Sequence, residues 1–443
     1  MQHSDDDKDG RIDRRSFLQA AGAVAGTALA TSALSYDRIL GANDRIALGH
    51  IGIGNRGGQL HLMASRLKNT YNVESVAVCD LWTTNRERAA SDAERYYGRR
   101  PRAVQHPEEL LALKDVDAVF IATPEHSHSA LLKATVEAGK HAYCEKPMGN
   151  VLEEVKAARD TVRQRNLVVQ IGTQHRSEPY QLAAREVLRS GALGDISKYE
   201  IVWNYNGPRW RGRPQVKQIR EADTDWKAWL RTKPLRPFDP QLYFEFRLYR
   251  EFSSGIPDQW MSHGIDLVHF YTNAVPRSVV AHGGVFAWHD GRQNPDTFQA
   301  LVEYPSFLVS YSTSFGNDCD SFSRIMGKKA TLVNIGGEGS PRWKVVEEKG
   351  NHEDTPTIDR AERWVTLPGD DKPGPINIGD EDLSHMTNWF ECLRAGNRQT
   401  NATVEHGFLH SVACIMAAQS YWSGKRLYYD AKAERITETA PAT

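Results

Sequence analysis

The feature that most constrains the fold is a glycine motif between a predicted strand and a predicted helix. Arg45–Ile51 is a short apolar run that is typical of a buried strand. Gly52-Ile53-Gly54-Asn55-Arg56-Gly57 follows at once, and Gln59–Leu67 has the pattern of a helix. In such a G-x-G-x-x-G motif the glycines permit a tight turn, close approach of a pyrophosphate, and close packing of helix on strand. We therefore expect a dinucleotide at the N-terminus of this helix, which favours negative charge.

The next strand carries a residue that bears on the choice of dinucleotide. Val73–Cys79 reads as a strand and ends at Asp80, which lies 23 residues beyond Gly57. A carboxylate at this place accepts hydrogen bonds from the ribose hydroxyls and repels a 2′-phosphate. The sequence thus favours NAD, while Arg86 could accommodate the extra phosphate of NADP.

Two further strands end in polar residues. Val116–Ala122 leads to Thr123-Pro124, and His141–Cys144 leads to Glu145-Lys146-Pro147, with a helical pattern between them. Alternating strands and helices predict a doubly wound parallel sheet. Loops at the carboxyl ends of such strands line the ligand crevice, so Thr123, Glu145 and Lys146 are expected there.

These motifs resemble a known family. Thr123-Pro124-x-x-x-His128 and Cys144-Glu145-Lys146-Pro147, following the glycine motif, are similar to the signature of the Gfo/Idh/MocA family. The resemblance runs from about Arg45 to the C-terminal helix. It implies an α/β protein with an NAD(P)-binding Rossmann domain over residues 45–167 and a substrate domain with an open, largely antiparallel sheet over residues 168–430. It also implies that Lys146 lies between nicotinamide and substrate, where an ammonium can stabilise developing alkoxide charge.

A second family motif lies in the predicted substrate domain. The family pattern D-x-x-x-H-x-x-D corresponds to a segment in which His263 and Asp266 share a helix face. The resemblance makes His263 the base that takes the substrate hydroxyl proton. Asp258 stands five residues before His263 rather than four, and Gln259 holds the expected place. Either Asp258 reaches the site through a one-residue bulge, or Gln259 replaces it.

The candidate site residues fall into three groups. Lys146 and His263 are the expected catalytic pair. Asp258, Asp266, His175 and Arg176 are expected at the substrate. The remaining residues are expected at the cofactor: Gly52, Gly54, Asn55, Arg56, Gly57, Asp80, Thr123, Pro124, His128 and Glu145, together with Lys146. The histidines and cysteines have no spacing typical of metal ligands, so no metal is expected.

The N-terminus resembles an export signal. Arg14-Arg15-Ser16-Phe17-Leu18 precedes a mildly apolar stretch, Ala20–Leu34, that is too short to span a bilayer comfortably. This order is similar to a twin-arginine (Tat) signal peptide over residues 1–35, which implies export of a folded protein to the periplasm. No other run could form a stable membrane span. Because the periplasm has no dependable pool of free nicotinamide cofactor, an exported enzyme of this kind would need to bind its cofactor tightly.

Composition narrows the range of partners. The formal net charge is −1 with interspersed signs, so nucleic acid is not an expected partner. Many tryptophans occur in the second domain; rings stack on sugars, although core packing explains most of them. An open sheet face is compatible with a homo-oligomer.

The sequence is compatible with three functions. The leading one is oxidoreduction of a sugar or polyol at a CH–OH group by bound NAD(H). The second is a redox-neutral reaction in which transient oxidation permits elimination, glycoside hydrolysis or epimerisation. The third is sugar binding without catalysis, against which the presence of both Lys146 and His263 argues.

Overall fold

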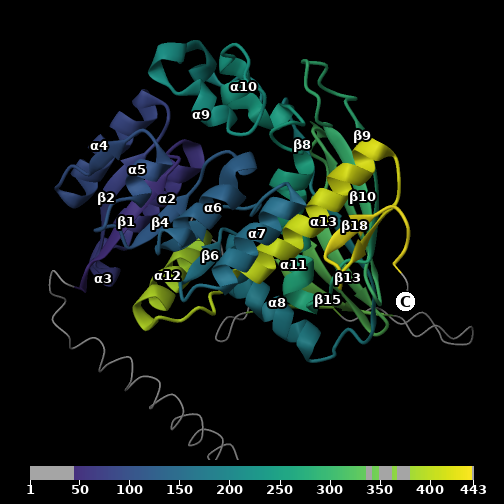
Figure 1. Ribbon diagram of the computed structural model, residues 1–443. Helices are drawn as coiled ribbons and strands as arrows, with labels where there is room; N and C mark the ends of the chain where they lie inside the picture. The colour runs from purple at the N-terminus through teal and green to yellow at the C-terminus, as the bar shows by residue number, and fades with distance from the viewer. Residues whose placement is uncertain (1–43, 336–341, 349–361, 367–379, 442–443) are drawn as a thin grey trace, which may run out of the picture. The chain divides into compact units, whose positions relative to one another are not determined.

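The computed structural model describes residues 44–335, 342–348, 362–366 and 380–441 (Figure 1). Ile46–Thr443 form one compact unit. The expected signal peptide, residues 1–35, lies outside the described residues. Within the described ranges, no helix combines the length and apolar character needed to cross a bilayer.

The first domain is built on a six-stranded parallel sheet of order β3-β2-β1-β4-β5-β6. This is the strand order of a dinucleotide-binding Rossmann fold, so the predicted doubly wound sheet is confirmed. The apolar runs become its buried strands because both faces carry helices. The strands are β1 (Ile46–Ile51), β2 (Val73–Cys79), β3 (Arg102–Val104), β4 (Ala118–Ile121), β5 (His141–Cys144) and β6 (Val169–Ile171). The helices include α2 (Asn55–Arg66), α4 (Thr83–Tyr97), α6 (His128–Glu137) and α7 (Leu152–Arg163).

The last strand of this sheet lies beyond the domain boundary expected at residue 167. β6 pairs in parallel with β5, so the first sheet continues to Ile171. The chain then enters the second domain through a short 3₁₀ turn, η3 (Gln174–Ser177), and helix α8 (Pro179–Arg189).

The second domain contains a ten-stranded sheet, which confirms the expected open, largely antiparallel architecture. β7 and β11 run parallel, whereas the other described pairings are antiparallel. Helices α11 (Ser262–Thr272) and α13 (Val404–Ser423) pack at this domain's core. Val280, Leu301 and Leu308 are exposed on strands whose burial alternates, so one face of the sheet is open. The strands are β7 (Ile196–Val202), β9 (Ser278–Gly284), β10 (Thr297–Glu303), β11 (Leu308–Ser314), β13 (Phe322–Gly327), β14 (Ala330–Ile335), β15 (Trp343–Glu347), β16 (Glu362–Trp364), β17 (Leu427–Asp430) and β18 (Arg435–Thr437).

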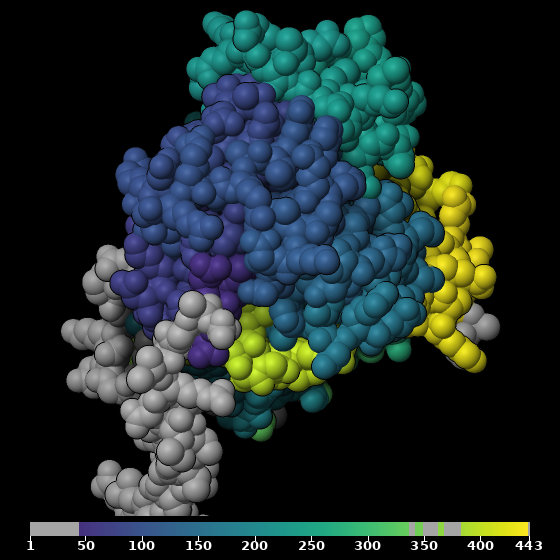
Figure 2. Space-filling view, turned by 60° about the vertical axis from the view of Figure 1, so that its left-hand side comes forward, coloured from purple at the N-terminus to yellow at the C-terminus, as the bar shows by residue number. Residues whose placement is uncertain are grey.

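A helical excursion between β7 and α11 forms a separate lobe, residues 207–248, which we call the aromatic lobe. Its elements are η4 (Pro214–Lys217), η5 (Glu221–Asp223), α9 (Trp226–Leu230), α10 (Pro240–Glu245) and η6 (Phe246–Leu248). Trp226, Trp229 and Tyr243 form an apolar cluster with Trp82 of the first domain. In Figure 2 the lobe stands in teal at one end of the blue Rossmann domain.

One C-terminal helix returns to the first domain. α12 (Asp380–Ala395) packs Met386, Trp389 and Phe390 against Leu48 and Phe120 of the parallel sheet. The Rossmann domain is therefore completed by residues more than 200 positions away along the chain.

Candidate active site

The glycine motif forms a tight turn between β1 and α2. Gly52 has a φ of +81°, and a Cβ there would lie 2.8 Å from the Thr123 nitrogen. A Cβ on Gly57 would lie 2.0 Å from the Gly52 carbonyl oxygen, so only glycine fits. Gly54 is different, because a Cβ on it would meet nothing closer than Asn85 at 4.0 Å. The open space beside Gly54 suits a pyrophosphate.

The start of α2 has free capacity for an anion. Gly54 is its N-cap and supplies no side-chain cap, so the first backbone N–H groups of the helix, including that of Asn55, are available. The Arg56 side chain turns elsewhere. It donates to Glu145 at 2.7 Å and forms a two-point ion pair with Asp382 of α12. Arg56 therefore links the cofactor turn to the loop after β5 and to α12.

Asp80 lies at the carboxyl end of β2 and organises the loops around it. Its carboxylate accepts hydrogen bonds from the backbone N–H groups of Ile53 and Trp82, each at 2.9 Å. Burial raises the pKa of Asp80, and those N–H bonds oppose the shift. The Asn85 side-chain amide also donates to Oδ2 at 3.3 Å, so Oδ1, which accepts only from Trp82, keeps a lone pair for a ribose hydroxyl. Arg86 donates to the Asp80 carbonyl oxygen at 2.8 Å.

The loops after β4 and β5 are tied together by His128. One ring nitrogen of His128 lies 2.7 Å from the Thr123 carbonyl oxygen, and the other lies 2.7 Å from that of Pro147. His128 is buried, so it positions these loops. The Thr123 hydroxyl lies 2.6 Å from that of Ser127. Pro124 precedes the 3₁₀ turn that leads into α6. A direct contact between His128 and the cofactor stays a prediction.

Lys146 leaves the end of β5 and reaches the second domain. Its ammonium donates to the Gln259 carbonyl oxygen at 2.6 Å. Burial lowers the pKa of Lys146 to about 8; Arg247 adds to this shift, and Glu145 opposes it. Two further N–H donors of the ammonium remain for a ligand.

His263 lies at the start of α11, one helical turn after Gln259. Its ring centroid is 4.9 Å from that of His175 and 5.9 Å from that of Trp203. Its Nδ1 is buried with no hydrogen-bond partner in the described part of the chain. Burial first, then the charge of Lys146, holds the pKa of His263 well below its usual value. The imidazole is therefore neutral near pH 7 and able to accept a proton.

The irregular spacing before His263 has a structural counterpart. Residues Pro257–Met261 form a π-helical turn (η7), which accommodates one residue more than an α-helical turn. Of the two alternatives that the five-residue spacing of Asp258 and His263 left open, the structure has the one-residue bulge. The Asp258 carboxylate accepts from the Ser254 backbone N–H at 2.7 Å and is buried. Its pKa is raised to about 6 by burial and by Glu125.

Asp258 and Gln259 therefore serve different partners. The carbonyl of Gln259 holds Lys146, and its side-chain amide donates to Glu125 at 3.0 Å. The Asp258 carboxylate accepts a hydrogen bond from the Ser254 backbone N–H. Contact of Asp258 with a substrate stays a prediction.

Arg176 and Asp266 form an ion pair in the interior. Arg176 Nε donates to Asp266 at 2.7 Å, and the two side chains are only 2% and 1% exposed. Burial alone would raise the pKa of Asp266, but Arg176 and His410 outweigh it and lower the pKa. The pair joins the loop after β6 to α11, and a substrate contact for either residue stays a prediction. The neighbouring His175 pairs with Glu178, and its ring contacts that of His263.

Sequence reasoning missed two residues beside Lys146. Glu125, only 1% exposed, accepts from Ser253 at 2.6 Å and Gln259 at 3.0 Å. Arg247 lies 3.5 Å from the same carboxylate. Glu125 sits inside the Thr123–His128 motif, so its position was visible, but its partners more than 120 residues away were not.

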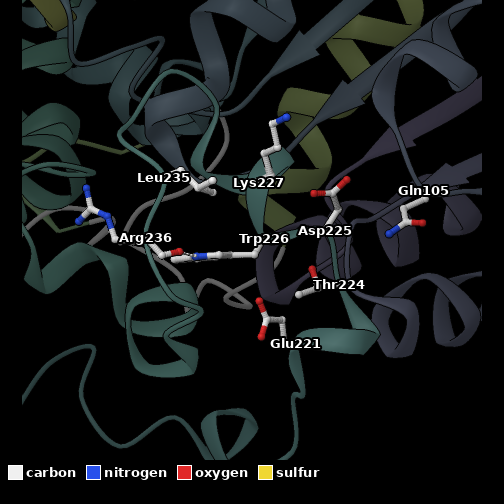
Figure 3. A pocket seen from close by; sticks show the side chains of 8 residues that line it. All are labelled: Gln105, Glu221, Thr224, Asp225, Trp226, Lys227, Leu235 and Arg236. Atoms are coloured by element: carbon white, nitrogen blue, oxygen red, sulfur yellow. Dashed lines mark hydrogen bonds between the residues drawn. The ribbon is translucent and has the colours of Figure 1, made fainter.

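Two other kinds of site, a metal centre and a surface pocket, are weaker candidates for the active site. Among the described residues, no group of three or more His, Cys, Asp or Glu side chains could hold a metal ion. A pocket of about 580 Å³ opens between Gln105 and the aromatic lobe, with Trp226 and Asp225 in its lining (Figure 3). Neither Lys146 nor His263 lines it.

Comparison with known protein families settles the family. Residues 46–173 match the Gfo/Idh/MocA model described as "Oxidoreductase family, NAD-binding Rossmann fold". Residues 231–429 match the model described as "Oxidoreductase family, C-terminal alpha/beta domain". The chain belongs to the Gfo/Idh/MocA family. Its first domain is accordingly an NAD-binding domain, and the geometry at Gly54 and the N-terminus of α2 fits that cofactor.

Curated relatives of this family member carry glycosidase names. A glycosyl hydrolase family 109 protein of Shewanella baltica is 29% identical over 245 residues, which are 50% of this chain and 51% of that protein. An alpha-N-acetylgalactosaminidase of Shewanella oneidensis is 28% identical over 247 residues, again 50% and 51% of the two chains. The chain spans about half the length of the curated relatives it matches.

Solved structures share its fold over a longer range. Levoglucosan dehydrogenase in complex with NADH aligns with a TM-score of 0.65 and 19% identity, covering 86% of this chain and 98% of that chain. An NAD binding oxidoreductase from Klebsiella pneumoniae aligns with a TM-score of 0.66 and 18% identity, covering 87% and 99%.

Proposed function

We propose that this protein is a sugar or polyol oxidoreductase that transfers hydride between a CH–OH carbon and tightly bound NAD. The observation that carries the proposal is the link from Lys146 through the Gln259 carbonyl to the helix turn that leads into His263. The proposal is that an ammonium from the NAD-binding domain and a neutral imidazole from the other domain act on one reacting oxygen.

Each residue then has a defined task. His263 takes the proton from the substrate hydroxyl, for which its lowered pKa keeps it neutral. Lys146 donates a hydrogen bond to the same oxygen and stabilises the negative charge that develops there. NAD, when bound, supplies the hydride acceptor. The fixed bond to Gln259 keeps the ammonium oriented, and the Arg176–Asp266 pair fixes α11, which carries His263.

The test begins with the nucleotide. Purified protein is denatured, the released nucleotide is identified, and the native holoenzyme is then mixed with a panel of sugars and polyols. The proposal expects bound NAD and a substrate-dependent absorbance change at the nicotinamide band. Protein that binds NAD no better than millimolar would contradict it.

A second candidate is a redox-neutral reaction, favoured by the glycosidase names of the curated relatives. In it the sugar is oxidised transiently, the resulting ketone acidifies a neighbouring C–H, and hydride finally returns. Turnover of a nitrophenyl glycoside by holoenzyme without added NAD, and without net absorbance change of the nicotinamide, would identify it.

We further propose export by the Tat route, on the strength of Arg14–Leu18 and the apolar stretch behind it. The folded holoenzyme would then enter the periplasm with its cofactor inside. Replacing Arg14 and Arg15 by lysine should leave the protein in the cytoplasmic fraction.

A further inference from the structure

Three arginines beside the active site have no role in the steps above. Arg209 and Arg213 lie in the first part of the aromatic lobe, and Arg247 lies in η6. Among the described residues, neither Arg209 nor Arg213 forms an ion pair. Arg247 lies 3.5 Å from the Glu125 carboxylate, and its Nε is buried without a hydrogen-bond partner.

A series of ring contacts connects Arg209 to His263. The Arg209 guanidinium lies 5.5 Å from the ring centroid of Trp260. Trp260 stacks on Trp203 at 4.5 Å, and Trp203 lies edge-on to His263 at 5.9 Å. Arg209 therefore stands at the outer end of an aromatic wall whose inner end is the proposed base.

A second series of contacts connects Arg247 to Lys146. It pairs with Glu125, which accepts from the Gln259 side chain, and the Gln259 carbonyl accepts from Lys146. Arg247 also helps to lower the pKa of Lys146, after burial itself.

The backbone that carries Arg209 and Arg213 is firmly held. The buried carboxylate of Glu245 accepts from the N–H groups of Gly212 at 2.7 Å and Arg213 at 3.1 Å, and pairs with Arg211. Trp210 has a φ of +68° and is buried, with its ring 5.3 Å from that of Phe315. A non-glycine residue keeps such a φ only where the surroundings fix it.

Positive charge is thus in excess beside the aromatic wall. Arg213 is half-buried and Arg209 is exposed; the pKa of Arg213 is lowered by burial and then by Arg247 and Arg209, while Glu245 opposes this shift. Like charges gathered in a partly buried place repel one another unless an anion joins them. Guanidinium groups suit carboxylate and sulfate oxygens, which they bind through two parallel hydrogen bonds.

We propose that the substrate is an anionic sugar, whose acidic group is bound by Arg209, Arg213 and Arg247 while its ring lies along Trp203 and Trp260. This inference rests on the proposed function, because it uses the same Lys146 and His263 site. The carboxylate of a uronic acid and the sulfate of a sugar ester share the required chemistry.

The test uses holoenzyme and matched probes. Each triad contains a neutral hexose, its uronic acid and its 6-sulfate, based on glucose, galactose or mannose. Affinity is measured by tryptophan fluorescence, to which Trp203 and Trp260 contribute, and oxidation is measured at the nicotinamide band. In one triad an acidic member should bind at least about tenfold more tightly than the neutral sugar. That advantage should shrink as NaCl is added.

Two variants locate the effect. Arg213→Met should remove most of the acidic sugar's advantage in affinity over the neutral sugar, whereas Arg213→Lys should retain part of that advantage. Arg220→Met is the control, since Arg220 lies in the same lobe, is 79% exposed, and pairs with Asp223. It should change neither affinity.

The outcomes separate the two proposals. Equal affinity for neutral and acidic sugars, or no effect of Arg213→Met, overturns the anionic substrate even if a neutral sugar is oxidised and the proposed function stands. Tight, Arg213-dependent binding of an acidic sugar without oxidation or glycoside turnover supports the anion site and counts against the proposed function. The preferred member of the triad distinguishes carboxylate from sulfate.

Discussion

Among single residues, Lys146 and His263 are coupled because the charge of one affects the protonation of the other. The pKa of Lys146 is lowered to about 8, and that of His263 is lowered well below its usual value, by burial first in both cases. At a pH below the pKa of Lys146 and above the lowered pKa of His263, the ammonium is charged and the imidazole is neutral. The proposed reaction needs this combination.

The pH profile should therefore have an alkaline limit set by Lys146. The ammonium is present below its pKa of about 8 and is lost as pH rises through it, so kcat/KM should fall over that range. Lys146→Arg should be slower, yet its alkaline limb should disappear, because guanidinium stays charged. An unchanged alkaline limb in this variant would assign that limb to another group.

His263 should be separable from cofactor binding. His263→Ala removes the general base, so we expect turnover to fall by about 10²–10⁴-fold while NAD content stays normal. Lys146→Ala should reduce turnover at least as much. The double variant should lose far less than the product of the two effects if both residues act on one step. Near-normal turnover in His263→Ala would point to His175 or Asp258 as the base.

The buried ion pair is a residue-scale feature that acts on stability. Asp266→Asn leaves the Arg176 charge unpaired in the interior, which typically costs about 3–5 kcal/mol in the free energy of unfolding. Urea unfolding of the wild type and of Asp266→Asn measures this loss in the free energy of unfolding. Asp195→Asn is the control, because Asp195 and Lys328 form an exposed pair at 81% and 75% and should leave the urea midpoint unchanged. Recovery of stability in Arg176→Met/Asp266→Leu would confirm that the unpaired charge was the cause.

Among helices and strands, those with strong periodicity were predictable and those defined by distant partners were not. The strand–Gly52–helix unit and the strand ending at Lys146 follow from local pattern, so the cofactor side of the site was visible in the sequence. The five-residue spacing of Asp258 and His263 left either a bulge or a replacement by Gln259 open, and it did not show that the Asp258 carboxylate accepts from Ser254. Spacing gives the face of a helix and not the partner on that face.

The aromatic lobe was hidden for a similar reason. Residues 206–223 are mostly polar and show no clear apolar periodicity, whereas the structure has η4 and η5 there and α9 and α10 beyond. These short helices are held by tertiary packing, with Trp229 and Tyr243 against Trp82. Trp82 is two residues from Asp80, so the lobe lies beside the adenosine half of the proposed cofactor site.

The lobe should slow release of NAD. Phe244 lies edge-on to Trp82 at 5.1 Å, and Phe244→Ala removes this support beside Asp80. We expect NAD to dissociate about five- to tenfold faster, as the loss of one aromatic pair implies. Nucleotide retained after timed gel filtration gives the rate. Phe286→Ala, at a position 69% exposed beyond β9, is the control and should leave the rate unchanged.

On the scale of the whole molecule, the two family domains are interleaved. One apolar cluster contains Ile51 and Ile171 of the first sheet together with Ile265 of α11 and Val412 of α13. α12 adds Trp389 to the other face of the first sheet, and Asp382 pairs with Arg56 at the cofactor turn. A domain boundary near residue 167 therefore divides the sequence, but the apolar clusters contain residues from both sides of that boundary.

This interleaving predicts one cooperative unfolding transition for both domains. Loss of α12 uncovers Leu48 and Phe120 and releases Arg56, so neither domain can unfold and leave the other intact. In urea, NAD release, tryptophan fluorescence and far-ultraviolet circular dichroism should share one midpoint. A fragment of residues 46–173 should not bind NAD, whereas the same fragment with residues 380–395 joined by a flexible linker should regain part of the binding. Two separated transitions, or a fragment 46–173 that binds NAD as well as the full chain does, would show instead that the NAD-binding domain folds independently.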